Sequence, residues 1–240
     1  MVCLYTWKAK RRHSLKVFKV FAFFSLTMLT FLVRPASAKV SHDFASWTGI
    51  LFQGGFTTKY GYYLEIQDRL NKTLAGGNRF IIRPAFRYSV TTELSLWAGY
   101  GWLPAFSPFR GENRLWQQAF YQTRAGSWQL IGRVRIDERW LSNAGGAAFR
   151  GRVMFRSLLA LDPEALISLC FWDEYFQNLN TVSNGPVSGF DQNRSFLGLN
   201  YLLTKDIQVE SGYLNVFVNQ SGTAPDIMNH ILGLYIILNV

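Results

Sequence analysis

Two residue types that build catalytic and metal sites are scarce in this chain. It has two cysteines, Cys3 and Cys170, and three histidines among 240 residues. Cys3 lies in an N-terminal segment with the features of a cleaved signal, so no disulfide forms within a mature monomer. Cys170 lies in an apolar run, which favours a packing role. With so few histidines and cysteines, and no oxygen-ligand loop pattern, we expect no metal or other cofactor.

Long apolar runs are absent after residue 38, which excludes a bundle of membrane helices. Residues 1–38 instead resemble a secretory signal, with six basic residues between positions 8 and 19, an uncharged apolar run at 20–33 and small residues at 36–38. The apolar run is shorter than the ~20 residues that a spanning helix needs. We expect cleavage before Lys39 and export, with an uncleaved N-terminal anchor as the alternative.

Lysine is scarce in the part of the chain that remains. The first 38 residues hold seven of the 25 basic residues and none of the 15 acidic ones, so their removal lowers the net charge from +10 to +3. The remaining chain has fourteen arginines and only four lysines. The high isoelectric point therefore belongs largely to the signal, and we expect no nucleic-acid partner.

What the chain has in quantity is two-residue alternation of polar and apolar side chains, while helical periodicity is hard to find. The alternation predicts strands near 44–53, 59–69, 79–89, 93–102, 113–123, 128–139, 149–160, 165–176, 192–202, 206–217 and 229–239. Many of these reach the ~9–11 residues that a tilted strand needs to cross a bilayer. The pattern predicts an all-β protein with membrane-spanning strands.

The predicted connections alternate in length. Short turns are expected at 54–58, 89–92, 124–127, 161–165 and 203–206, and longer loops at 70–78, 103–112, 140–148, 177–191 and 218–228. This alternation is typical of outer-membrane barrels, whose short turns are periplasmic and whose longer loops are extracellular. A Greek-key sandwich gives no reason for it.

Thirteen of the fourteen arginines after residue 38 share one face of the predicted strands, as Arg150, Arg152 and Arg156 do. Successive side chains of a strand point to opposite faces, and the other faces are apolar with aromatic residues at their ends, as in a lipid-facing wall. An arginine on that wall would cost roughly 2–4 kcal/mol at the bilayer midplane. We therefore predict that the arginines point into a barrel lumen.

The charged residues predicted to face the lumen form the candidate site. They are Glu65, Arg69, Arg83, Arg87, Arg114, Arg133, Arg135, Asp137, Arg139, Arg150, Arg152, Arg156, Glu174, Arg194 and Glu210, and Glu93 has the same parity. Their positive excess has two interpretations, a packed plug of ion pairs and an anion path or anionic-ligand site. Because a barrel of this size also has to hold Trp97, Trp116, Phe120 and Trp172, we favour the plug.

The number of strands is the one inconsistency in this pattern. Eleven strands would put the two ends of the barrel chain on opposite sides of the membrane, whereas bacterial barrels have an even number. We expect one antiparallel up-and-down barrel over residues 39–240 with ten to twelve strands, and twelve are preferred.

Several short strings agree with this architecture and carry a family resemblance. They are Trp47, EIQDR at 65–69, RP at 83–84, GY at 99–100, ENRLWQQ at 112–118, RVRIDER at 133–139, FRGR at 149–152, DE at 173–174, FDQNR at 190–194 and GY at 212–213. In order and spacing they resemble the uncharacterised bacterial outer-membrane barrel family catalogued as domain of unknown function 2490, over nearly all of the chain after residue 38. The resemblance implies the fold and the outer-membrane location, and it brings no catalytic residues.

The function expected from these features is that of a non-enzymatic integral outer-membrane protein with a largely filled, arginine-rich lumen. Its partners would be outer-membrane lipid, the barrel-assembly machinery that the fold implies, and small anions if the alternative, a narrow anion-selective channel or anionic-ligand-binding barrel, holds. Two further alternatives are a soluble periplasmic β-sheet binding protein and an outer-membrane enzyme that hydrolyses lipids or peptides.

Little in the sequence favours the enzyme. Its base would be His42, which precedes the first predicted strand, or His230, which has no serine two residues away on the same strand face. Asp173 and Glu174 are adjacent, so their side chains point to opposite faces and form no carboxylate pair. The loops 103–112 and 177–191 are a third place where a partner or ligand could bind.

Overall fold

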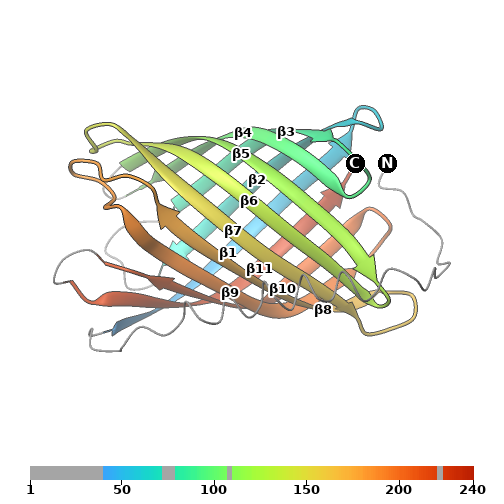
Figure 1. Ribbon diagram of the computed structural model, residues 1–240. Helices are drawn as coiled ribbons and strands as arrows, with labels where there is room; N and C mark the ends of the chain where they lie inside the picture. Colours follow the sequence, from blue (N-terminus) through green and yellow to red (C-terminus); the bar gives the residue numbers. More distant parts are fainter. Residues whose placement is uncertain (1–39, 72–78, 107–109, 221–223) are drawn as a thin grey trace. The chain divides into compact units, whose positions relative to one another are not determined.

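The described residues form eleven strands. The computed structural model describes residues 40–71, 79–106, 110–220 and 224–240, and the predicted signal at 1–38 lies outside them. The strands are β1 (Val40–Gly55), β2 (Tyr60–Asn71), β3 (Arg79–Ser89), β4 (Leu94–Ala105), β5 (Arg110–Ala125), β6 (Trp128–Leu141), β7 (Ala147–Ala160), β8 (Ile167–Asn178), β9 (Gly189–Leu202), β10 (Ile207–Val218) and β11 (Asp226–Asn239) (Figure 1). Most are long enough to cross a bilayer when tilted.

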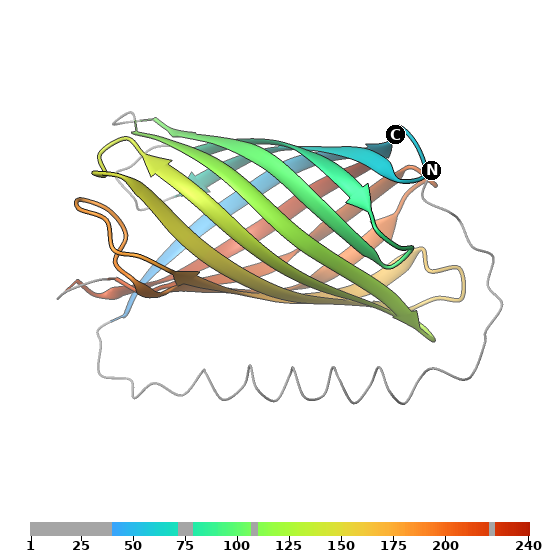
Figure 2. The ribbon, with the colours of Figure 1, turned by 45° about the horizontal axis from the view of Figure 1, so that its top comes forward.

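The eleven strands close into a barrel through one parallel pair. Each strand pairs antiparallel with the next, and β1 runs parallel to β11 from Val40 opposite Asp226 to Gln53 opposite Asn239. Figure 2 shows the tilted strands on both walls of the closed barrel. The preference for twelve strands is therefore wrong, although eleven lies within the predicted range. The even-number rule assumes that the first and last strands meet antiparallel, and a parallel closure accepts an odd number.

Parallel closure puts the two ends of the barrel chain at opposite rims. Val40 lies at the rim that holds the connections 142–146 and 179–188, here called the loop end. Val240 lies at the other rim, the turn end, where its backbone N–H donates to the carbonyl oxygen of Gln53 over 2.9 Å. The Gln53 amide also donates to Asn239 Oδ1 over 2.7 Å. These two bonds join β1 to the end of the chain at the turn end.

The predicted loop at 103–112 is largely strand. β4 continues to Ala105 and β5 begins at Arg110, so only 106–109 connects them. Pro104 and Gly111, which suggested a loop, lie opposite each other in the ladder between the two strands. The connection is no longer than the turn at 56–59, so the predicted length alternation fails at this hairpin.

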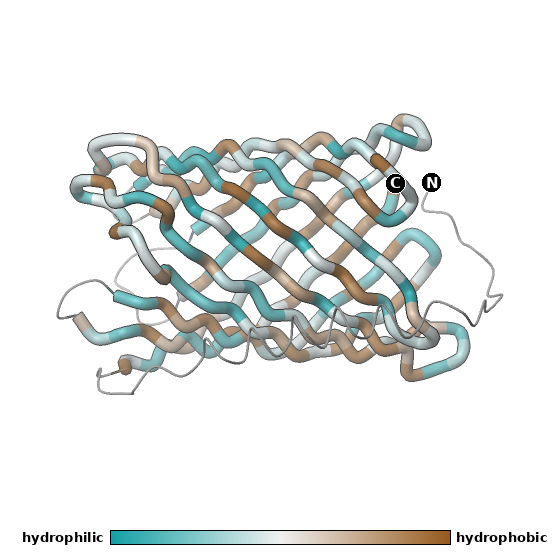
Figure 3. The backbone as a smooth tube through the Cα atoms, in the orientation of Figure 1, coloured by the Kyte–Doolittle hydropathy of each residue, from teal (hydrophilic) through white to brown (hydrophobic). Residues whose placement is uncertain are grey.

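The outer face of the barrel is apolar and has aromatic rims. Large apolar side chains are exposed there, among them Val134 at 55% and Leu232 at 66%, and Figure 3 shows polar and apolar residues alternating along the strands. Trp102 and Trp140 lie near the loop end, and Trp128 begins β6 at the turn end. Such rims are typical of a wall that contacts lipid at both interfaces.

The inner face holds an apolar cluster as well as charge. Its buried members are Trp47, Ile131, Met154, Leu158, Cys170, Phe196, Leu214, Val216 and Ile231. Gly198 and Gly212 lie opposite each other beneath the ring of Phe196, and a Cβ at Gly212 would lie 2.8 Å from Phe196 Cζ. Such a Cβ would also lie 2.4 Å from the Leu197 carbonyl oxygen, so glycine at this position lets both the β9 backbone and the ring come close.

Candidate functional site

The strand register places the fifteen predicted charged residues on one common face of the sheet. Glu65 pairs with Arg83, and a continuous row of register partners joins Arg87, Arg135 and Arg152. Ten of the fifteen are buried: Glu65, Arg83, Arg114, Arg135, Asp137, Arg139, Arg150, Arg152, Glu174 and Glu210. The other five are half-buried: Arg69, Arg87, Arg133, Arg156 and Arg194.

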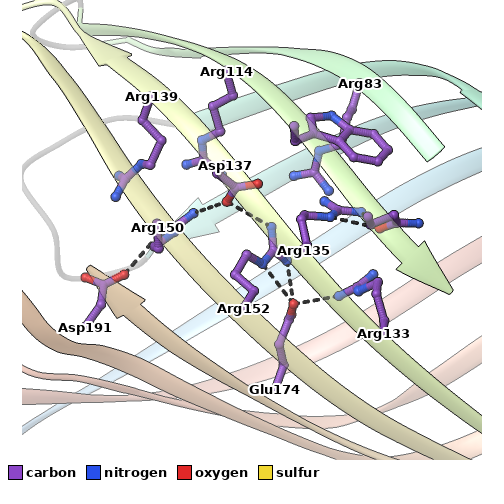
Figure 4. Close-up of polar contacts among 12 residues, drawn as sticks. Arg83, Arg114, Arg133, Arg135, Asp137, Arg139, Arg150, Arg152, Glu174 and Asp191 are labelled. Carbon is purple, nitrogen blue, oxygen red and sulfur yellow. Dashed lines mark hydrogen bonds and ion pairs between the residues drawn. The ribbon is translucent and has the colours of Figure 1, made fainter. Parts of the chain in front are cut away.

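Asp137 on β6 joins two arginines of β7. Its Oδ2 accepts from Arg150 Nη2 at 2.9 Å and from Arg152 Nη1 at 3.4 Å (Figure 4). Arg150 turns its other terminal nitrogen to Asp191 Oδ2 at 3.0 Å. The side chains of Asp137, Arg150 and Arg152 are at most 5% exposed. A buried pair is stable only when both partners are present, because removal of one leaves an uncompensated charge.

Glu174 on β8 extends this network toward the turn end. Its Oε1 accepts from Arg152 Nη2 at 2.8 Å and from Arg133 Nη2 at 2.6 Å. Arg152 therefore lies between two carboxylates, those of Asp137 and Glu174 (Figure 4). We call the chain Asp191–Arg150–Asp137–Arg152–Glu174–Arg133 the central network. It links β6, β7, β8 and β9 through charge-assisted hydrogen bonds, which are stronger than neutral ones.

Three smaller ion-pair clusters lie on the same face. Glu112 accepts from Arg114 Nε and Arg139 Nε, both at 2.6 Å. Glu65 accepts from Arg83 Nη1 at 2.9 Å and from the Tyr63 hydroxyl at 2.9 Å.

The third cluster is centred on Glu210. It accepts from Arg156 Nη2 at 2.5 Å, and the Cys170 thiol donates to it over 3.3 Å. Cys170 is fully buried, in keeping with the packing role expected for it.

Two carboxylates of these clusters are missing from the predicted set. Glu112 and Asp191 fall in the segments read as loops 103–112 and 177–191. Glu112 precedes Arg114 by two residues and shares its face, a signal that the sequence does contain. Asp191 follows the irregularity in the β8–β9 ladder, where alternation is interrupted and gives no such signal. Glu93 lies in the turn 90–93 and accepts from the Tyr121 hydroxyl near the outer face, so its predicted inward direction is wrong.

Three arginines of the candidate site, Arg69, Arg135 and Arg194, contact aromatic rings closely instead of carboxylates. A fourth, Arg87, lies 6.0 Å from the centre of the Trp97 ring and also has no ion-pair partner among the described residues. Arg135 donates twice to Gln118 Oε1, and its Cζ lies 4.0 Å from the centre of the Trp116 ring. Arg69 lies over Trp47 at 3.6 Å, while Arg194 lies 5.2 Å from Trp47 and 4.5 Å from Phe176. None of the three has a carboxylate within ion-pair distance in the described part of the chain. Their contacts are cation–π interactions, which leave guanidinium hydrogen-bond capacity unused.

The two histidines that could supply the base of an enzyme lie in contact on the outer wall. His42 lies within β1, not before it, and its Nδ1 is 2.9 Å from Nε2 of His230 across the β1–β11 seam. The Tyr213 hydroxyl is 2.6 Å from His230 Nδ1. Among the hydrogen bonds of the described residues, neither imidazole contacts a serine, threonine or cysteine, so no nucleophile–base pair is formed.

Two further features are absent from the described residues. No three metal-ligating side chains gather at one place in this part of the chain. Nor do the described residues contain a helix of the length and apolar character that membrane crossing requires.

Similar proteins are found by sequence and by structure. An uncharacterized protein of Methylorubrum extorquens is 28% identical over 204 residues, which cover 83% of this chain and 89% of that protein. The porin NanC has a TM-score of 0.48 at 10% identity, over 77% of this chain and 93% of that one. LpxR from Salmonella typhimurium has a TM-score of 0.45 at 5% identity, over 74% and 83% of the two chains. At these values neither structure transfers a function to this chain.

The family assignment is more definite than these likenesses. A family model described as "Protein of unknown function (DUF2490)" matches residues 44–227, which include the wall from β1 to the beginning of β11. This is the family that the order of the short strings indicated. The chain belongs to the DUF2490 family.

Proposed function

We propose that this protein is a non-enzymatic integral protein of the bacterial outer membrane whose lumen is closed by its central network. The observation that carries the proposal is the burial of the network. The side chains of Asp137, Arg150, Arg152 and Glu174 are at most 5% exposed although they point to the inside of a barrel. A water-filled bore beside them would leave them accessible to solvent. The ion pairs therefore act as packing as well as charge compensation.

The membrane location is supported by the outer wall. Large apolar side chains such as Leu96, Val134 and Leu232 are exposed on it, an arrangement that would favour aggregation in water and favours insertion in a bilayer. Trp102, Trp128 and Trp140 lie near its rims. The signal features at 1–38 are consistent with export through the periplasm. Outer-membrane lipid and the barrel-assembly machinery are then the expected partners.

A narrow anion path is the second candidate function. It is favoured by Arg69, Arg135 and Arg194, whose guanidinium groups contact aromatic rings and form no direct ion pair with a carboxylate among the described residues. Rings or rows of arginine favour anions in pores. We rank this function second because the central network fills the lumen beside these residues.

Two measurements test the proposal. Heat-modifiable migration on a detergent gel and partition into the outer membrane are expected for the full chain, and complete extraction by carbonate would contradict the membrane location. In planar bilayers the native protein is expected to show no discrete conductance. The double variant Arg150→Ala/Arg152→Ala, which shortens two side chains of the network, is expected to conduct if it folds. A discrete anion-selective conductance of the native protein would contradict the closed lumen and favour the anion path instead.

A further inference from the structure

The inner wall has a second kind of charged region beside the central network, which it meets where Arg194 lies opposite Glu174 in the β8–β9 ladder. It consists of Trp47 on β1, Arg69 on β2 and Arg194 on β9, and we call it the Trp47 site. We propose that the Trp47 site binds a small oxyanion of the phosphate or carboxylate class. This inference goes beyond the proposed function, and it requires only that the barrel is folded.

The first support is geometric. Trp47 and Arg69 are direct register partners on β1 and β2, and the Arg69 guanidinium carbon lies 3.6 Å from the centre of the Trp47 ring. Arg194 reaches the same ring from β9, with its guanidinium carbon 5.2 Å from the centre. One indole thus contacts two cations that come from strands far apart in the barrel order. Two like charges this close repel each other unless an anion compensates them.

The second support is a set of hydrogen-bond donors without acceptors. Trp47 is 7% exposed, and its indole N–H finds no acceptor among the described residues. The Nε of Arg194 is also buried without an acceptor. Arg69 donates its Nε to Gln67 Oε1 over 2.8 Å, a bond that does not use its two terminal nitrogens. Buried donors without partners are unfavourable, and these three side chains contain only donors.

The chemistry of the donors selects the ligand class. Arginine stays protonated, so the charge of the site cannot be removed by loss of a proton. The planar guanidinium fork matches the paired oxygens of a phosphate or carboxylate. An oxyanion offers several acceptors at once and can meet two guanidinium groups and the indole N–H, whereas a halide ion offers no paired oxygens to a fork.

Accessibility separates this site from the central network. Arg69 and Arg194 are half-buried, while Arg150 and Arg152 are at most 5% exposed. Arg69 is two residues from the end of β2, and Arg194 is five residues from the beginning of β9, both counted from the loop end. The loop end is therefore the rim from which an anion would approach the Trp47 site.

Phosphate titration of the full-length protein in detergent is the test. We expect inorganic phosphate to quench or shift tryptophan fluorescence in a saturable way and to raise the unfolding midpoint, relative to sodium chloride at equal ionic strength. Arg69→Gln and Arg194→Gln should each weaken phosphate binding about tenfold or more, since each removes charge-assisted hydrogen bonds. Arg124→Gln, the same change at an exposed position of the turn end, is the matched control and should bind phosphate like the native protein.

Trp47→Phe keeps a stacking ring and removes only the N–H, and it should weaken binding by a smaller factor. It serves as the test if an arginine variant fails to fold. No saturable phosphate effect on the native protein, or equal binding by all folded variants, would overturn the site. A heat-modifiable barrel that does not bind phosphate would overturn the Trp47 site alone. A chain that forms no membrane barrel would instead overturn the proposed function.

Discussion

The central network and the Trp47 site use the same side chain in two different ways. In the network, Arg150 and Arg152 each lie between two carboxylates and are almost completely buried. At the Trp47 site, Arg69 and Arg194 stack on aromatic rings and stay half-buried. The two regions share one inner face of one barrel, so the difference comes from which side chains reach each guanidinium. Register alone does not decide it, because Arg194 lies directly opposite Glu174, whose ion pairs go to Arg133 and Arg152.

The difference shows what a carboxylate does for a buried arginine that an aromatic ring does not. A bridging carboxylate neutralises the charge and occupies the fork, so the pair can be packed against others in a low-dielectric interior. A ring contacts the flat face of the guanidinium and leaves its N–H groups free. The first arrangement stabilises the wall, and the second keeps the ability to bind an acceptor from solution.

The largest expected effect is the loss of a bridging carboxylate from the central network. Glu174→Gln removes the charge that compensates Arg133 and Arg152, and we expect the free energy of unfolding to fall by about 3–5 kcal/mol. Glu65→Ala should also destabilise the barrel, by less, because Glu65 pairs with Arg83 alone. The measurement is the free energy of unfolding in urea in detergent micelles.

The control for these variants is Glu164→Gln, at an exposed glutamate of the turn 161–166. It should change the free energy by less than about 0.5 kcal/mol. If Glu174→Gln changed the free energy of unfolding as little as the control does, the lumen would be hydrated. The proposal of a closed lumen would then be wrong.

A second variant pair probes the apolar cluster to which Trp47 belongs. Gly198→Ala would place a Cβ 2.2 Å from the Ser211 carbonyl oxygen and 2.7 Å from Phe196 Cζ, and we expect a loss of about 1–3 kcal/mol from overpacking. Gly132→Ala is the matched control, because a Cβ at Gly132 meets no atom within 4 Å. Equal unfolding free energies for the two variants would contradict close packing of Gly198 against the β10 backbone and Phe196.

Substitution by methionine tests the comparison between the two kinds of arginine directly. Arg152→Met leaves Asp137 and Glu174 with one arginine fewer each and should cost about 3–5 kcal/mol. Arg135→Met removes an arginine that has no carboxylate partner in the described part of the chain, and it should change stability by no more than about 1 kcal/mol, chiefly through Gln118. Urea unfolding of the two variants under one condition is the check. Similar losses for both would show that the carboxylates do not distinguish the two kinds of arginine.

The smallest expected effect concerns a turn outside the wall and provides a pH dependence. The Asp162 carboxylate accepts the backbone N–H groups of Ile167 at 2.7 Å and Leu166 at 3.0 Å. These bonds hold the pKa of Asp162 below its usual value. Since the folded pKa is the lower one, the stabilisation is complete above the unfolded pKa of about 4 and is lost as the pH falls through the folded pKa.

Asp162→Ala should therefore lower the unfolding midpoint at neutral pH, and its difference from the native protein should shrink in acid. Thr204→Ala is the control, since the Thr204 hydroxyl accepts the Ile207 N–H in an equivalent turn and does not titrate in this range. Its effect should not depend on pH. A constant difference for Asp162→Ala from pH 7 to pH 2 would show that the carboxylate charge is irrelevant to the turn.

The sequence alone determined the strands and the chemistry of their two faces. Alternation with a period of two is a local property, so Arg150, Arg152 and Arg156 could be assigned to one face before any contact was known. The apolar opposite faces and the aromatic residues near strand ends predicted a barrel wall in the same way. The predicted boundaries fail where proline or glycine lies inside a ladder, as at Pro104 and Gly111.

Only the tertiary structure decided how the barrel closes and which side chains meet. The parallel pairing of β1 with β11, the contact of His42 with His230, and the approach of Arg194 to Trp47 join residues far apart in the chain. Register between distant strands depends on the closure of the whole barrel, which no local pattern encodes. The same local rule that points every arginine inward therefore leaves open which of them meets a carboxylate and which meets an aromatic ring.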